Sequence, residues 1–382
     1  MKGCSVFLYG YWEHNLGDDL FLYLFMKRYP NTHVYLLTKS KYKTLYSYGR
    51  ITPIVNDTFL FHIKNKLCKV FTSKGFIFQR IVPEADCAVI LGGSLFMEGG
   101  NWRGYMASTY SNMRKFSKRC YVLGCNFGPF ESEEFLEFFS DLLLEMDGVC
   151  LRDRYSVNLI GSSLRTRKGI STKEFESKIR YVPDIAFQLL NTKMILPSSP
   201  YSDCYVISII QPERRIGLHG YGEIYKRAIL SLALRLTEED EEKPVIFYAA
   251  SAALGDGDMA VELCRNMEES GRRAVSYEYK ELDESLALLK EAKGIIATHF
   301  HTMLLGILYE VPTYPVIYNL KMETVIKDYG FLGKSIKVKE LTENKAEWLE
   351  EVIEALGCKP VISKDMIERS ELFFQYTDKI LH

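Results

Sequence analysis

Short apolar runs alternate with longer amphipathic segments along the first half of the chain. The runs that predict β-strands, rich in β-branched and aromatic residues, are 4–9, 34–38, 86–91, 120–124 and 148–151. Two of the intervening segments, 18–28 and 132–146, carry apolar residues at three- and four-residue spacing with acidic residues in the first turn, which predicts helices. This alternation is typical of βαβ units, so we expect a parallel sheet.

A second series of the same kind follows a linker-like segment, 191–200, that contains two prolines and two serines. Its predicted strands are 204–210, 244–250, 274–277, 294–297 and 312–318, and its predicted helices lie near 224–236, 258–267, 282–292 and 302–310. The pattern predicts an α/β protein with Rossmann-like domains at 1–192 and 201–362, and a terminal helix at 363–382 that could pack back on the N-terminal domain. Ligands of open parallel sheets bind beyond the carboxyl ends of the strands, so we expect the domains to face across a cleft that holds the site.

Composition narrows the class of protein and its partners. A chain of 382 residues with 47% hydrophobic and 25% charged residues excludes a disordered or fibrous protein. Its net charge of −1 provides no overall field for nucleic acid, so any anion site must be local. No apolar stretch reaches the roughly 18 residues of a membrane span, and no cleavage site follows the first apolar run. Nine scattered cysteines without C-x-x-C indicate reduced thiols, so we expect a cytoplasmic protein.

Glycines and small polar residues follow three of the strands predicted in the first half. The segments are 10–19 (GYWEHNLGDD), 92–94 (GGS) and 124–129 (GCNFGP). Their clustering at one sheet edge favours a binding site. The alternative is that Asp18 or Asp19 caps a helix and the glycines only turn the chain. The next strand ends in Arg152-Asp153, where a cation site and a helix cap are again both compatible with the sequence.

Two histidines, His299 and His301, follow the predicted strand 294–297. A His-x-His pair can bind zinc, but no Cys or carboxylate lies at ligand spacing nearby, so we expect no metal. General acid or base chemistry suits the pair better, although a structural role for one of them stays open. Lys321 ends the next strand as a lone cation, a position where a lysine is often simply exposed.

In this order, the segments resemble the polysaccharide pyruvyl transferase family. The resemblance covers about residues 4–330 and includes Asn-x-Gly-Asp at 15–18, the glycine pair with Ser94, G-x-x-x-G-P at 124–129, Arg-Asp-x-x-Ser at 152–156 and Pro-Asp at 183–184. It is strongest at 297–321, where a His after a strand is followed by an apolar helix, a Pro-containing strand and a Lys. One departure is His299, because many family members carry Arg two residues before that His.

The resemblance implies a GT-B-like fold and a reaction. Pyruvate would pass from phosphoenolpyruvate to two hydroxyls of a sugar as a cyclic ketal, with release of phosphate and without a further cofactor. The roles that it implies are catalytic for His301, Arg152 and Asp18, donor-binding for Arg152, His299, His301 and Lys321, and acceptor-binding for Asn15, Asp18, Ser94 and Asn126. The acceptor would be a surface polysaccharide or its lipid-linked oligosaccharide precursor.

Two other classes of function stay open. A nucleotide-sugar glycosyltransferase of the same architecture would use the second domain, where Gly255-Asp256-Gly257-Asp258 fits either a nucleotide site or a helix start. A non-catalytic carbohydrate-binding relative is supported by His299 alone. Peripheral association with the inner face of a membrane is compatible with the sequence, whereas the acceptor sugar, its hydroxyl pair, the ketal stereochemistry and the oligomeric state are not specified by it.

Overall fold

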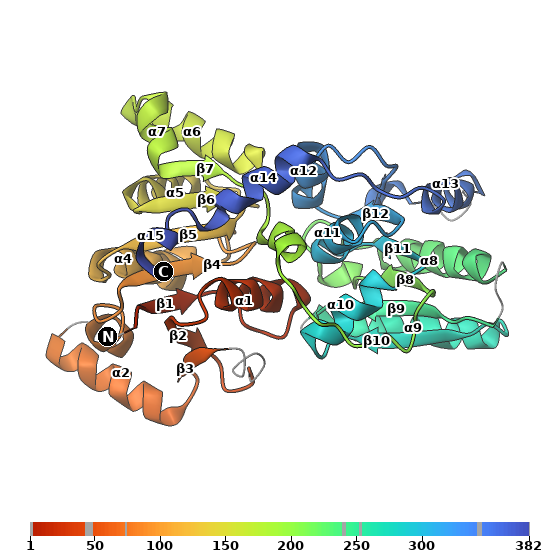
Figure 1. Ribbon diagram of the computed structural model, residues 1–382, viewed down its shortest axis with the longest axis horizontal. Coiled ribbons are helices and arrows are strands. Elements are labelled where there is room, and N and C mark those ends of the chain that lie inside the picture. The colour runs from red at the N-terminus through yellow and green to blue at the C-terminus, as the bar shows by residue number, and fades with distance from the viewer. Residues whose placement is uncertain are drawn as a thin grey trace. The chain divides into compact units, whose positions relative to one another are not determined.

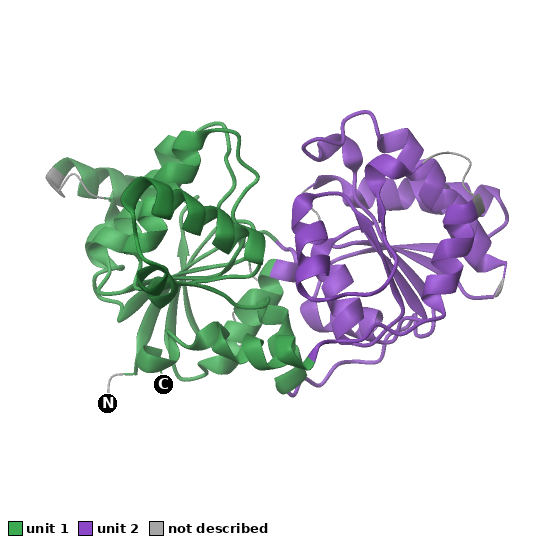
Figure 2. Ribbon diagram, turned by 90° about the horizontal axis from the view of Figure 1, so that it is seen from above, with its two compact units in different colours: residues 1–13, 18–192, 364–382 green, residues 14–17, 193–363 purple. Residues whose placement is uncertain are grey.

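Two parallel sheets organise the chain, one in each of two compact units (Figure 2). The computed structural model describes residues 3–42, 49–72, 75–238, 242–251, 254–341 and 346–381. Unit 1 comprises residues 1–13, 18–192 and 364–382, and unit 2 comprises residues 14–17 and 193–363. The boundary after residue 192 lies in the irregular segment that the prolines and serines of the sequence indicate.

The sheet of unit 1 has seven strands in the order β3-β2-β1-β4-β5-β6-β7, all parallel to their neighbours. Its strands are β1 (Ser5–Tyr9), β2 (His33–Thr38), β3 (Arg50–Val55), β4 (Cys87–Leu91), β5 (Cys120–Cys125), β6 (Gly148–Leu151) and β7 (Ile179–Tyr181). Its helices are α1 (Leu16–Arg28), α2 (Phe59–Thr72), α3 (Phe76–Arg80), η2 (Trp102–Met106), α4 (Ala107–Phe116), α5 (Glu133–Glu145), α6 (Arg154–Lys168), α7 (Thr172–Lys178) and η3 (Ile185–Asn191). The first two residues of α1 belong to unit 2 by the division above.

One face of this sheet is buried under α3 to α6. Ile77, Met113, Phe139 and Ile160 of these four helices join strand residues in one apolar core. The core explains why α5 forms where the sequence predicts it, since Phe135, Phe139 and Leu142, at three- and four-residue spacing, are buried in it.

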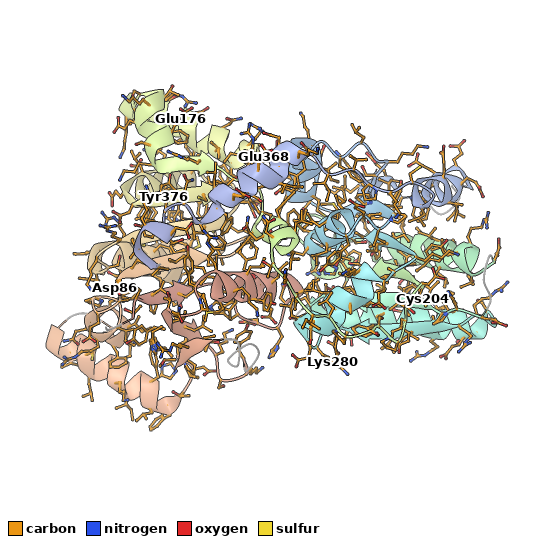
Figure 3. The ribbon with its side chains drawn as sticks, in the orientation of Figure 1. Asp86, Glu176, Cys204, Lys280, Glu368 and Tyr376 are labelled. Carbon is orange, nitrogen blue, oxygen red and sulfur yellow. The ribbon has the colours of Figure 1, made fainter. Side chains whose placement is uncertain are left out.

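The C-terminal segment lies with α1 on the other face of the same sheet (Figure 1). Phe373 and Phe374 make edge contacts with Phe21 and Phe25 of α1, at ring-centroid distances of 6.4 and 6.3 Å. Tyr376, labelled in Figure 3, lies over β6 at Gly148. This segment is not the single helix expected from the sequence but three pieces, α14 (Lys364–Ser370), η7 (Glu371–Phe374) and α15 (Asp378–Leu381). Phe373 and Phe374, both in η7, are buried.

Unit 2 has six parallel strands in the order β10-β9-β8-β11-β12-β13. They are β8 (Tyr205–Ser208), β9 (Val245–Ala249), β10 (Ala274–Glu278), β11 (Gly294–Ala297), β12 (Thr313–Ile317) and β13 (Ile336–Lys337). Its helices are η4 (Pro212–Arg214), α8 (Gly222–Thr237), α9 (Asp256–Glu269), α10 (Leu282–Lys290), α11 (Phe300–Leu308), α12 (Leu320–Asp328), η6 (Val338–Glu340) and α13 (Ala346–Leu356). Side chains of α8, α9 and α13 form the core on one face of the sheet.

Strand order reverses once in each sheet, between β1 and β4 in unit 1 and between β8 and β11 in unit 2. In open α/β sheets the crevice beyond the carboxyl ends of strands at such a point is where ligands bind. The ends of these four strands therefore determine where each unit can carry chemistry.

The expected α/β class with two parallel sheets is confirmed, and each predicted strand corresponds to an observed one. The sequence did not predict three of the observed strands. These are β3, which contains Pro53 and has mostly exposed or partly exposed side chains at the sheet edge, β7, which has three residues, and β13, which has two. Among the helices of the described residues, none has the length and apolar character needed to cross a membrane.

Candidate active site

Arg152, which follows β6, is the largest fully buried side chain of unit 1 and lies beneath the glycine pair that follows β4. Its Nη1 donates to Asp184 Oδ2 at 2.9 Å, and its Nη2 donates to Asn126 Oδ1 at 2.6 Å. A Cβ atom added to Gly93 would lie 2.6 Å from Nη1, so this position requires glycine. Ser94 Oγ donates to the same Asn126 oxygen at 3.2 Å. Three predicted site residues, Arg152, Asn126 and Ser94, therefore form one internal hydrogen-bond network.

The next residue, Asp153, is the N-cap of α6. Its carboxylate accepts from the backbone N–H and the hydroxyl of Ser156, at 2.6 and 2.9 Å. The Ser156 hydroxyl oxygen also accepts from the backbone N–H of Phe127 at 2.8 Å. The Arg-Asp-x-x-Ser segment thus combines both of its possible functions, since the Asp caps the helix while the Arg joins the network beneath Gly93.

At the switch point of unit 1, the Asp18 carboxylate lies beside Gly92, 3.8 Å from where a Cβ of that glycine would be. Asp18 is partly exposed, whereas Asp19 is buried and accepts a hydrogen bond from the Tyr42 hydroxyl at 2.6 Å. Neither aspartate is the cap of α1. That position belongs to Asn15, whose Oδ1 accepts from the backbone N–H of Gly17 at 2.9 Å.

His299 lies at the switch point of unit 2, immediately after β11, as the N-cap residue of α11. Its Nδ1 is 2.9 Å from the hydroxyl of Ser208, the last residue of β8, and its Nε2 is 3.0 Å from Oδ2 of Asp256. Asp256 is fully buried and also accepts two hydrogen bonds from Nη2 of Arg215, at 2.8 and 2.7 Å. Both ring nitrogens of His299 are thus engaged within unit 2, so a donor molecule could contact either nitrogen only by displacing a partner.

The pKa of Asp256 depends on its burial and on the neighbouring His299 and Arg215. Burial raises the pKa of its carboxyl, but the hydrogen bond and charge of His299 and the charge of Arg215 outweigh burial and hold the pKa below its ordinary value. Asp256 is therefore an anion in the folded protein. Since a carboxylate can only accept, Nε2 of His299 is the hydrogen-bond donor to Asp256.

His301 lies in the first turn of α11 and is partly buried. Residues 14–17 lie alongside it, and a Cβ atom on Gly17 would be 1.9 Å from Nδ1 of its ring. The same segment is held by an antiparallel bridge between Asn15 and Ser251, after β9, and by a hydrogen bond from the backbone N–H of Leu16. The Asn-x-Gly part of the first motif and the histidine of the last motif thus meet in unit 2.

Lys321 lies in the first turn of α12, and its Nζ is 5.1 Å from the ring centroid of Phe300, the residue before His301. Asn319 caps this helix by accepting from the backbone N–H of Met322 at 3.1 Å. Because β11 and β12 are adjacent and parallel, α11 and α12 both start at the same sheet edge. Helix N-termini and a lysine at one edge make this part of unit 2 suited to an anion.

The structure divides the predicted site residues between the units. Asn15, His299, His301 and Lys321 belong to unit 2, whereas Asp18, Ser94, Asn126 and Arg152 belong to unit 1. The sequence did not single out Ser208, Arg215 or the partnership of Asp256 with His299. The strand-end argument applied to β8 would have indicated Ser208, but nothing in the sequence pairs Arg215 with a carboxylate 41 positions away.

Within the residues that the structure describes, no group of three or more His, Cys, Asp or Glu side chains could hold a metal ion. Metal independence stays a prediction.

Two Rossmann-like units in tandem, each with polar residues at its switch point, define a GT-B-like α/β protein. Comparison with solved structures agrees. The UDP-GlcNAc 2-epimerase from Methanocaldococcus jannaschii has a TM-score of 0.56 at 13% identity, over 98% of this chain and 99% of that one. The UDP-GlcNAc 2-epimerase from Neisseria meningitidis, bound to UDP-GlcNAc, has a TM-score of 0.55 at 10% identity, over 98% of this chain and 99% of that one. At these identities the likeness shows the fold alone.

The family is shown by sequence. The model of the family described as polysaccharide pyruvyl transferase matches residues 15–319. The chain therefore belongs to the polysaccharide pyruvyl transferase family and is a transferase enzyme, as its motifs predict.

Proposed function

We propose that this enzyme transfers a pyruvyl group from phosphoenolpyruvate to two hydroxyls of one sugar in a surface polysaccharide or its lipid-linked precursor, and releases phosphate. The observation that carries the proposal is the meeting of two family motifs in unit 2. Gly17 lies directly against the His301 ring, and the Lys321 ammonium group lies over Phe300, the residue before His301.

The donor has an electron-rich methylene carbon and two anionic groups. In the proposed reaction His301 gives a proton to the methylene carbon, which becomes a methyl group, and C2 becomes electrophilic. The first sugar hydroxyl adds to C2 and loses its proton. The C2–O bond to phosphate then breaks, phosphate leaves with the bonding pair, and the second hydroxyl attacks C2 and loses its proton. One of the two hydroxyl protons replaces the proton that the enzyme gave to carbon. The other leaves with phosphate or solvent.

The anionic groups of the donor require local cations, since the chain has a net charge of −1. Lys321 is the proposed point charge, supported by the first-turn amides of α11 and α12. Arg152 and His299 are less suited to direct contact with the donor. The Arg152 guanidinium is fully buried against Asp184 and Asn126, and both nitrogens of His299 have partners. We propose that these two residues position the strand ends and do not touch the donor.

The sugar contacts belong to the proposal as well. Asp18 is the carboxylate proposed to accept a hydroxyl proton, because it is partly exposed at the switch point of unit 1. Asn15 is proposed to hold the acceptor through its side-chain amide. Asn126 and Ser94 are used inside the network of Arg152, so their proposed contribution is to shape the loops that follow β4 and β5.

The test supplies purified enzyme with phosphoenolpyruvate and acceptor glycans and measures phosphate release together with formation of the pyruvyl ketal by mass spectrometry. Replacement of His301 by Asn should lower turnover by about 10² to 10⁴, the usual contribution of a general acid. The matched control is His219→Asn, because that histidine side chain is 74% exposed. Turnover of sugar nucleotides in place of phosphoenolpyruvate would refute the proposed donor.

A further inference from the structure

Helix α2, labelled in Figure 1, carries a stripe of large apolar side chains that are exposed on unit 1. The exposed fractions are 81% for Phe59, 61% for Leu60, 41% for Ile63, 53% for Leu67 and 71% for Val70. At about 100° per residue these five positions fall within roughly a quarter to a third of the helix circumference. Single exposed apolar residues are ordinary on a protein surface, but five that form one stripe indicate an interaction surface.

The opposite side of α2 holds the helix on its unit. The ring of Phe61 is 6.4 Å from that of Phe76 in an edge contact and packs against the core. The Asn65 side chain accepts a hydrogen bond from the backbone N–H of Phe76 at 3.0 Å. The helix is therefore attached to α3 through one face, and the apolar stripe is on another.

The charge of α2 identifies the kind of partner. Lys64, Lys66 and Lys69 are exposed, and the sequence has no Asp or Glu between positions 59 and 72. On the helical wheel Lys64 and Lys66 flank the apolar stripe on its two sides. Apolar side chains bordered by lysines match a lipid surface whose headgroups are anionic. A second copy of this chain is a poor match for the same reason, because two such faces would bring lysines together.

We propose that the exposed face of α2 binds the surface of an anionic lipid bilayer, with the helix axis parallel to the membrane plane. The helix has 14 residues, about 21 Å of length, which is short of the roughly 30 Å of a bilayer core. It therefore lies in the interface with its apolar side chains among the acyl chains and its lysines at the headgroups. The inference rests on α2 alone and is independent of the proposed donor and acceptor.

The experiment mixes the full-length protein with vesicles of phosphatidylglycerol and phosphatidylcholine, or of phosphatidylcholine alone, and measures the bound fraction by flotation. We expect binding to the anionic vesicles that weakens with salt. Replacing all three lysines with Gln should lower the partition coefficient about fivefold for each lysine, or about a hundredfold together. The triple variant Leu60→Ser/Ile63→Ser/Leu67→Ser should lower it by at least about tenfold.

The matched control replaces three exposed apolar residues outside α2, in the variant Ile216→Ser/Leu332→Ser/Val361→Ser, whose native side chains are 84%, 96% and 80% exposed. It should float like the wild type. Circular dichroism of every variant checks that the protein is folded. Equal loss of flotation in the control, or binding that does not depend on phosphatidylglycerol, overturns the proposal. A dimer without vesicles that the α2 variants abolish, with no flotation of the wild type, also overturns it and assigns the face to a second copy.

Discussion

Substitution of Gly17 by Ala tests the position of His301 without changing any side chain that could carry out chemistry. A Cβ atom at this position would lie 1.9 Å from Nδ1 and 2.1 Å from Cε1 of the imidazole. Ordinary contacts of a Cβ begin near 3.4 Å, so the ring must move by about 1.5 Å relative to the segment that carries residue 17. Gly17 does not have a positive φ, so the backbone itself accepts alanine.

The expected effect is therefore large on catalysis and small on folding. A misplacement of about 1 Å in a catalytic group costs on the order of 10² in rate, so kcat should fall about a hundredfold. In a helix, alanine is more stable than glycine by about 0.5 to 1 kcal/mol, which offsets part of the roughly 1 to 3 kcal/mol of overpacking. The net change in unfolding free energy should be at most about 2 kcal/mol.

The assay measures phosphate release from phosphoenolpyruvate at saturating acceptor, with thermal unfolding of the same samples. The control is Gly100→Ala, because a Cβ at that position has nothing within 4 Å. If Gly17→Ala keeps kcat within about threefold of the wild type while a crystal structure shows His301 displaced, His301 is not the proton donor. If the ring has not moved, the contact between residues 14–17 and α11 is wrong.

Three further predictions follow from buried or hydrogen-bonded charges. Arg152→Met should lower the unfolding free energy, measured in urea, by about 3 to 5 kcal/mol because it leaves the buried Asp184 carboxylate without its cation, and adding Asp184→Asn should restore part of the loss. His299→Gln should change phosphoenolpyruvate affinity, measured by calorimetry, by less than about threefold, since both ring nitrogens already bind Ser208 and Asp256; a larger loss would make His299 a donor contact. Glu98 has a pKa lowered to about 2 by hydrogen bonds from Ser132, the N-cap residue of α5, and from nearby backbone N–H groups. Its contribution to stability is therefore complete above about pH 4.5 and is lost as pH falls toward 2, so Glu98→Gln should flatten the acid side of a stability–pH curve, and an unchanged slope would contradict this pKa.

Strand ends could be predicted from the sequence because they depend on local patterns. The buried strands β1, β4, β5 and β11 are continuous apolar runs, and each ends at a glycine or a polar residue. In a parallel sheet those ends share one edge, so a list of the residues that follow them contains most of the candidate site. His301 and Lys321 were found in this way, since β11 and β12 are neighbours.

What each of those residues touches could not be predicted, because the partners are distant in sequence. Arg152 finds Asp184 32 positions later, and it is this pairing that makes its guanidinium an internal support. The same sequence motif would fit an exposed arginine that binds the donor. Likewise, an Asp at the start of α9 is equally consistent with a helix start or a nucleotide contact, and only the fold brings Asp256 to Arg215 and His299.

The two histidines differ in surroundings because of where each stands relative to the start of α11. His299 is the N-cap residue, with an extended backbone at φ −93° and ψ 141°, and its ring contacts the end of β8 and the buried Asp256. His301 is inside the first helical turn, and its ring lies against Gly17. Both nitrogens of His299 already have partners inside unit 2, so we propose His301 as the histidine that gives the proton to the substrate. The cluster around His299 then holds the residue from which α11 begins, and through the helix backbone it sets the position of His301 two residues later.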